Sequence, residues 1–118
     1  MDNRIIDDMN NRIPPHIQKI LRETVRALQK IYATRLKELI LFGSYARGDF
    51  TEESDIDLLL LLEGFADIAA ERAQYFPVIS QLSLQFDTVI SVIPYDINEF
   101  RSARTPFLLN VAKEGVKL

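Results

Sequence analysis

Five consecutive leucines, Leu58–Leu62, follow an Asp-Ile-Asp segment near the middle of the chain. A run this short cannot span a bilayer, because a membrane helix needs about 20 apolar residues. A short apolar run bounded by polar residues is instead typical of a strand that is covered on both faces. The sequence therefore predicts that Asp55–Leu62 is a buried strand, which requires a sheet with helices packed over it.

Further elements are predicted on both sides of this strand. Residues 1–12 are polar and are interpreted as a loose lead-in or a short helix, and Pro14-Pro15 marks the start of the next helix. Apolar spacing and turn residues then predict helices over 15–35, 65–83, 96–103 and 106–113, and strands over 38–42 and 86–93. Pro77 is expected to kink or divide the second of these helices, and Asp96 is expected to cap the third. The predicted fold class is α/β (α+β), with a small mixed β-sheet flanked by helices.

Length and composition limit the kinds of protein that this chain can be. Its 118 residues fit a single domain over 1–118. The chain has no cysteine, so a metal must be held by oxygen ligands or by His16, the single histidine. A net charge of −3 argues against a dedicated nucleic-acid surface. The first residues lack the apolar stretch of a signal peptide, so the expected location is the cytoplasm.

Gly43-Ser44 at the end of the predicted strand 38–42 is the first feature that carries chemistry. Glycine lets the backbone approach a ligand closely, and Ser44 adds a hydroxyl donor, a combination that suits phosphate. The pair is not a P-loop, because the Gly-Lys-Ser/Thr ending is absent. On its own it is more typical of an ordinary turn.

Asp55 and Asp57 are the second feature. Residues two apart on a strand point to the same face, so these two carboxylates repel each other unless a cation lies between them. Mg²⁺ prefers such hard oxygen ligands and also binds substrate phosphates. The alternative is a polar strand end that is solvated by water.

Asp87 is the third feature, and it lies near the start of the predicted strand 86–93. A carboxylate on a buried strand needs a partner or an ion. If this strand neighbours Asp55–Leu62, Asp87 can join the other two carboxylates in one cluster. The alternative is an aspartate at an exposed strand end.

Gly43-Ser44, the Ser-Asp-Ile-Asp-Leu run over 54–58 and the later Asp87 together resemble the DNA polymerase β-like nucleotidyltransferase superfamily. Ala-Arg-Gly shortly after Gly-Ser is most similar to its minimal nucleotidyltransferase (MNT) subfamily, and the resemblance covers about residues 36–92. It implies the polymerase β-like fold. It also implies that Asp55, Asp57 and Asp87 are catalytic and hold Mg²⁺, with two ions expected.

The resemblance further implies that Gly43 and Ser44 bind the triphosphate of ATP. Arg47 is a third candidate for nucleotide binding, although it could equally cap a helix or pair with Asp49. Tyr45 could accept a nucleotide itself, but a packing or surface role is favoured. Phe107, beside Leu108 and Val111 on the last predicted helix, is interpreted as core or as part of a docking surface.

The acceptor is expected to be presented by another protein, because larger relatives carry an acceptor domain that this sequence lacks. MNT proteins resemble the antitoxin half of toxin–antitoxin modules, and their partner is a HEPN toxin that receives AMP on a tyrosine. An oligomer or a hetero-complex with such a toxin is therefore expected. Two alternatives stay open: nucleotidyl transfer to a small molecule such as an aminoglycoside, and a non-catalytic antitoxin that neutralises its partner by contact.

Overall fold

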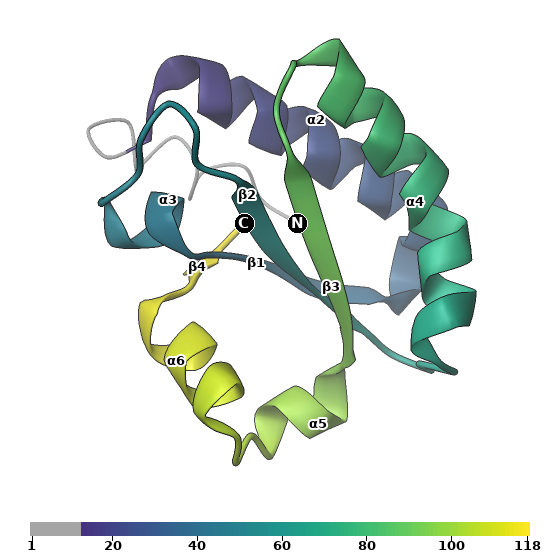
Figure 1. Cartoon of the computed structure of the whole chain (residues 1–118). Coiled ribbons are helices and arrows are strands. Elements are labelled where there is room, and N and C mark those ends of the chain that lie inside the picture. Colours follow the sequence, from purple (N-terminus) through teal and green to yellow (C-terminus); the bar gives the residue numbers. More distant parts are fainter. Residues whose placement is uncertain (1–12) are drawn as a thin grey trace.

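The computed structural model describes residues 13–118, in which helices cover both faces of one four-stranded sheet (Figure 1). The predicted lead-in over residues 1–12 lies outside the described residues. The strands are β1 (Leu36–Phe42), β2 (Ile56–Leu62), β3 (Ile90–Asp96) and β4 (Val116–Lys117), in the spatial order β3-β2-β1-β4. The helices are α2 (Pro15–Tyr32), α3 (Ser44–Arg47), α4 (Ile68–Gln85), α5 (Ile97–Arg101) and α6 (Pro106–Glu114), with a 3-10 turn η1 (Ala33–Arg35) after α2.

The sheet is mixed, as predicted. β1 pairs antiparallel with β2 and with β4, whereas β2 and β3 run parallel and are connected through α4. β2 is therefore an inner strand, and all five of its leucines are 0% exposed. This confirms both the buried strand and the α/β fold class that the sequence predicts.

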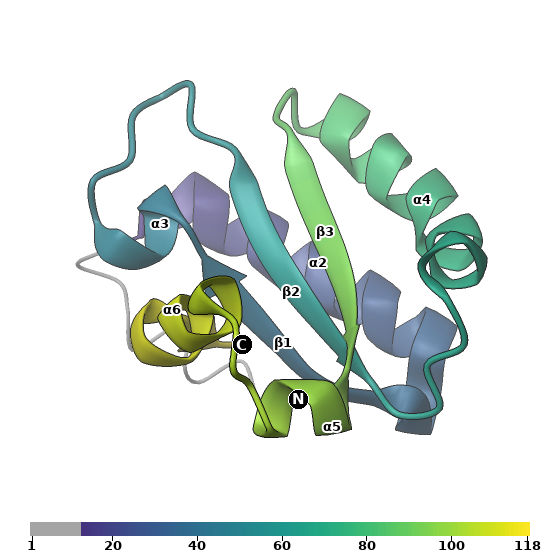
Figure 2. The ribbon, with the colours of Figure 1, turned by 60° about the horizontal axis from the view of Figure 1, so that its bottom comes forward.

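Alternate residues of the inner strands supply two separate cores, one on each face of the sheet. Figure 2 shows α2 and α4 on one face, and α5 and α6 on the other. Leu58, Leu60 and Leu62 pack under α2 and α4, whereas Leu59 and Leu61 pack under α5 and α6. The strand period of two makes this division necessary, because successive side chains point to opposite faces. Asp57 has the same parity as Leu59, so its side chain belongs to the face that carries α5 and α6.

Most predicted elements are found within a few residues of their expected ends. α4 continues through Pro77 as one helix, so the expected division at this residue is wrong. Asp96 caps α5 by accepting hydrogen bonds from the backbone N–H groups of Asn98 and Glu99, as predicted. Among the described residues, no helix is long and apolar enough to cross a membrane.

The third strand is the main correction. The sequence predicts it over 86–93 and closed by Pro94, whereas β3 spans Ile90–Asp96 and contains Pro94. The turn after α4 occupies the residues between, and Asp87 lies in that turn with a positive φ of 49°. The apolar residues around Asp87 suggested a strand, but Phe86 ends the helix and Val89 is 56% exposed.

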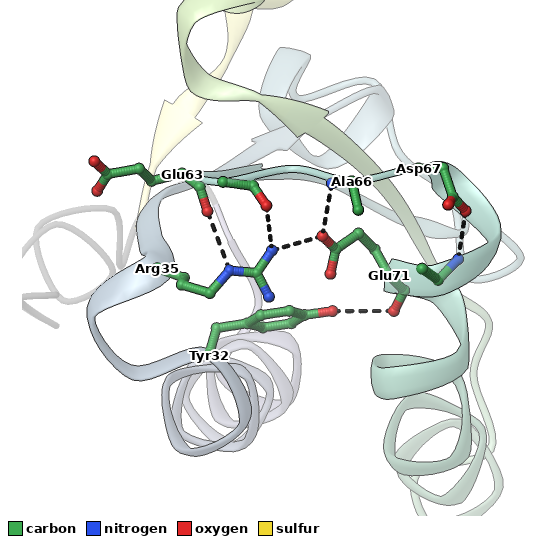
Figure 3. A network of polar contacts seen from close by, with 8 residues as sticks. Tyr32, Arg35, Glu63, Ala66, Asp67 and Glu71 are labelled. Carbon is green, nitrogen blue, oxygen red and sulfur yellow. Dashed lines mark hydrogen bonds and ion pairs between the residues drawn. The ribbon is translucent and has the colours of Figure 1, made fainter.

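A partly buried ion pair joins η1 to the start of α4, next to the residues that follow β2 (Figure 3). Arg35 Nη2 lies 2.6 Å from Glu71 Oε2, and the Glu71 side chain is only 2% exposed. Arg35 also donates to the carbonyl oxygens of Glu63 and Gly64, and its guanidinium carbon lies 5.5 Å from the centre of the Tyr32 ring. These contacts reach Oε2 of Glu71, whereas its Oε1 is buried without a hydrogen-bond partner among the described residues.

Candidate nucleotide-binding site

Gly43 turns the chain sharply from β1 into the one-turn helix α3. Its backbone angles, φ 77° and ψ −155°, are in a region that glycine adopts and other residues avoid. Its carbonyl accepts hydrogen bonds from the backbone N–H groups of Ala46 and Arg47, so α3 begins directly after it. Ser44, the first residue of α3, is thereby held at the end of β1.

Asp57 lies directly beside this turn. In the antiparallel pairing of β1 with β2, Asp57 is opposite Phe42, the residue before Gly43. A Cβ atom on Gly43 would overlap Oδ2 of Asp57. The absent side chain of Gly43 therefore makes the room in which the Asp57 carboxylate lies, which brings two of the sequence-predicted residues together.

Two carboxylates come together at the start of β2. Asp55 is exposed and immediately precedes the strand, and Asp57 is half-buried within it. Burial raises the pKa of Asp57, the charge of Asp55 raises it further, and Arg47 opposes the shift. A half-buried carboxylate beside a second one favours a bound cation, and the oxygen donors suit Mg²⁺. The pair therefore fits the metal that the sequence predicts.

Arg47 lies at the rim of the site. It is exposed, and its Nε lies 3.3 Å from Asp49 Oδ2, so the pairing with Asp49 that the sequence left open is present. Its Nη1 also lies 4.0 Å from Glu114 Oε2 on α6. Tyr45 is 4% exposed and stacks on Phe50 with ring centres 4.8 Å apart, which confirms a packing role.

A cavity of about 400 Å³ joins these residues to α6. Its lining includes Gly43, Ser44, Arg47 and Asp57 from the predicted site, and Phe42, Phe107, Asn110, Val111 and Glu114 from β1 and α6. A larger hollow of about 600 Å³ between α4 and β3 has no carboxylate in its lining. The sequence does not predict the contribution of α6. The only available signal was the helical spacing of residues 107, 110, 111 and 114, which places them on one side of the helix.

Asp87 is not brought to the carboxylate pair in the way the sequence predicts. It is exposed in the turn before β3, and the described residues 13–118 contain no group of three or more His, Cys, Asp or Glu side chains that could hold a metal ion. The residue beside Asp57 in the parallel pairing of β2 with β3 is Ser91. The geometry thus supports a site of two carboxylates, and a metal-binding role for Asp87 stays a prediction.

A family model and a curated relative match most of this chain. The model of the family described as "Nucleotidyltransferase domain" matches residues 19–118. The "Putative protein adenylyltransferase MJ0141" of Methanocaldococcus jannaschii is 35% identical over 102 residues, which cover 86% of this chain and 98% of that protein. The range matched by the family model includes Gly43, Ser44, Asp55 and Asp57.

Solved structures share the fold. A chain in the structure of a tri-AMPylated Shewanella oneidensis HEPN toxin in complex with MNT antitoxin has a TM-score of 0.56 and is 21% identical. The match covers 85% of this chain and 69% of that one. A toxin–antitoxin structure with AMP-PNP has a TM-score of 0.57 at 23% identity, over 80% of this chain and 69% of that one. At these identities the likeness establishes a common fold.

Proposed function

This chain belongs to the nucleotidyltransferase domain family, and on that premise we propose that it transfers AMP from ATP, with Mg²⁺, to a hydroxyl group of a partner protein. The observation that carries the proposal is the close approach of Gly43 to the Asp57 carboxylate, with Asp55 beside it. This arrangement combines room for a phosphate with oxygen ligands for a metal ion.

Each residue of the site has a distinct role in this proposal. Gly43 lets the triphosphate approach the backbone, and Ser44 donates its hydroxyl to a phosphate oxygen. Asp55 and Asp57 hold Mg²⁺, which when bound neutralises phosphate charge during transfer. Arg47, the one cationic side chain among the described residues that line the cavity, offsets further negative charge. Most of the work of the protein in phosphoryl and nucleotidyl transfer is positioning and charge neutralisation.

We further propose that the acceptor is a tyrosine of a HEPN-type toxin and that this chain acts as its antitoxin. One support is the likeness to the M. jannaschii relative, which is named a putative protein adenylyltransferase. The other is the fold shared with a chain from the complex of an MNT antitoxin and an AMPylated HEPN toxin. Transfer to a small molecule such as an aminoglycoside and neutralisation by contact alone are the alternatives.

The test is incubation with ATP labelled at the α-phosphate and Mg²⁺, with and without the protein encoded by the neighbouring gene. We expect label on the neighbour, and mass spectrometry is expected to locate AMP on a tyrosine. The Asp55→Asn/Asp57→Asn variant should transfer nothing. Glu53→Gln, which removes one exposed charge from the same loop, should transfer normally.

Other outcomes of this experiment would support one of the alternative functions or refute the role of the metal. Tight binding of the neighbour without label, unchanged in the double variant, would contradict catalysis and identify an antitoxin that acts by contact. Label on an aminoglycoside but not on the neighbour would retain nucleotidyl transfer and refute the protein acceptor. Omitting Mg²⁺ should abolish transfer, and transfer that persists in EDTA would refute the metal role of the two aspartates.

A further inference from the structure

The proposed function leaves one side of the 400 Å³ cavity unexplained. Gly43, Ser44, Arg47 and Asp57 form what we call its phosphate side, whereas four further lining residues come from α6. A triphosphate would be matched by the phosphate side alone. The α6 side therefore contacts another part of the ligand or has no binding role.

The chemistry of the α6 side differs from that of the phosphate side. Phe107 is 38% exposed, although its edge packs against Phe42 with ring centres 5.5 Å apart and ring planes at 83°. Leu108 and Val111, its neighbours on α6, are 4% and 3% exposed and belong to the core. Phe107 thus keeps part of an aromatic ring open to the cavity while adjacent apolar residues are covered.

Asn110 lies one helical turn after Phe107 and also lines the cavity. It is exposed, and among residues 13–118 its side chain makes no hydrogen bond. The amide offers both a donor and an acceptor, which matches the polar edge of a nucleobase. Glu114, a further turn along, lies 4.0 Å from Arg47 and so links α6 to the phosphate side of the cavity.

From these observations we infer that α6 is the nucleoside-recognition wall of the site, and this inference rests on the proposed function. Phe107 packs against the base, and Asn110 exchanges hydrogen bonds with its polar edge. Aromatic contact with a base is sequence-tolerant, whereas the amide distinguishes one base from another. The substrate class is a nucleoside triphosphate held at both ends, by the carboxylates and Ser44 at the phosphates and by α6 at the nucleoside.

The experiment compares two probes by calorimetry in the presence of Mg²⁺: ATP, and inorganic tripolyphosphate, which lacks a nucleoside. Phe107→Ala and Asn110→Ala should each weaken ATP binding by about tenfold or more, in line with the effect of removing a base contact. Tripolyphosphate binding should stay within about twofold of wild type. Asn110→Ala should also reduce the preference for ATP over GTP.

One control variant, and the exposure of Asn110, keep the result interpretable. Leu109→Ala removes an apolar side chain that is 52% exposed on the same helix but does not line the cavity, so it should leave both affinities unchanged. Phe107→Ala can disturb the contact with Phe42, but Asn110 is exposed, so Asn110→Ala tests the inference without a packing change.

The outcomes separate this inference from the proposed function. Loss of ATP affinity with unchanged tripolyphosphate affinity supports the α6 wall. Wild-type affinity for ATP in both variants, with binding still lost in Asp57→Asn, overturns the wall and leaves the proposed function intact. Equal loss of both probes also overturns it, because α6 would then act on the phosphate side. If the wild-type protein binds neither probe, the proposed function itself fails.

Discussion

The side chain that Gly43 lacks would occupy the position of the Asp57 carboxylate. A Cβ at residue 43 overlaps Oδ2 of Asp57, and the backbone of Gly43 has a positive φ of 77°. The glycine is therefore required twice, once for the turn into α3 and once for the space beside β2. These two requirements can be separated by experiment.

Gly43→Ala is expected to abolish nucleotidyl transfer and to destabilise the fold by on the order of 1–3 kcal/mol. Gly48 is a matched control, because its φ is also positive, at 90°, but a Cβ there would meet nothing within 4 Å. Gly48→Ala should therefore show backbone strain without loss of transfer. Urea denaturation and the labelled-ATP assay measure the two effects. Full transfer activity in both variants would show that the overlap with Asp57 is unimportant.

Because Ser91 and not Asp87 is the neighbour of Asp57 on β3, we predict that Asp57 contributes more to activity than Asp87 does. Asp57→Asn should remove several kcal/mol of transition-state stabilisation. Each ~1.4 kcal/mol removed lowers the rate of transfer tenfold. Asp87→Asn should cost much less, because Asp87 is exposed in the turn before β3. Ser91→Asp places a third carboxylate next to Asp57 and should lower the Mg²⁺ concentration needed for half-maximal rate. A loss in Asp87→Asn as large as that in Asp57→Asn would restore Asp87 to the site.

The Arg35–Glu71 pair predicts a large and non-additive effect on stability. Arg35→Leu leaves Glu71 buried and unpaired, which is expected to cost about 3 kcal/mol, near the low end for buried pairs because Arg35 is about one-third exposed. The double variant Arg35→Leu/Glu71→Leu should recover most of this loss. Urea denaturation of the four proteins in the cycle measures the coupling. Simple addition of the two single effects would contradict a buried ion pair.

The raised pKa of Tyr32 predicts that the free energy of unfolding falls at alkaline pH. Burial, followed by the charge of Glu71, raises the pKa of Tyr32 from 10.0 to about 12. The folded protein then holds the phenol proton more tightly than the unfolded chain, so the stabilisation is complete below about pH 10 and is lost as pH rises toward 12. Wild type should therefore lose up to about 1.4 kcal/mol per pH unit more than Tyr32→Phe across this window. Parallel loss in both proteins would refute the shift.

The outer edge of β3 is protected by side chains of α4. Ser83 Oγ accepts a hydrogen bond from Ile90 N–H, Tyr75 donates its hydroxyl to the Val92 carbonyl, and Pro94 has no N–H to offer. Exposed strand edges promote pairing between chains. Tyr75→Phe/Ser83→Ala should therefore increase self-association, detected by light scattering and size-exclusion chromatography. Ser80→Ala on the same helix is the control, and an unchanged double variant would show that Pro94 alone protects the edge.

The carboxylate pair and the glycine turn were predicted from the sequence because each depends on residues that are close along the chain. Gly43-Ser44 follows a strand, and Asp55 and Asp57 begin the next one, so local patterns place them at adjoining strand ends. The same local logic predicts the buried leucines of β2 and the cap at Asp96. It fails at Asp87, because apolar residues around a helix end and a turn resemble a buried strand when only the sequence is read.

What the sequence by itself determined is the set of elements and the identity of the residues that carry phosphate and metal chemistry, since hydrophobic period and turn residues act over a few positions. The tertiary structure decided which distant residues meet them. The register of β3 puts Ser91 beside Asp57, and the packing of α6 puts Phe107 and Asn110 across the cavity from Ser44. Register and helix placement depend on the packing of the whole core, which no local pattern encodes.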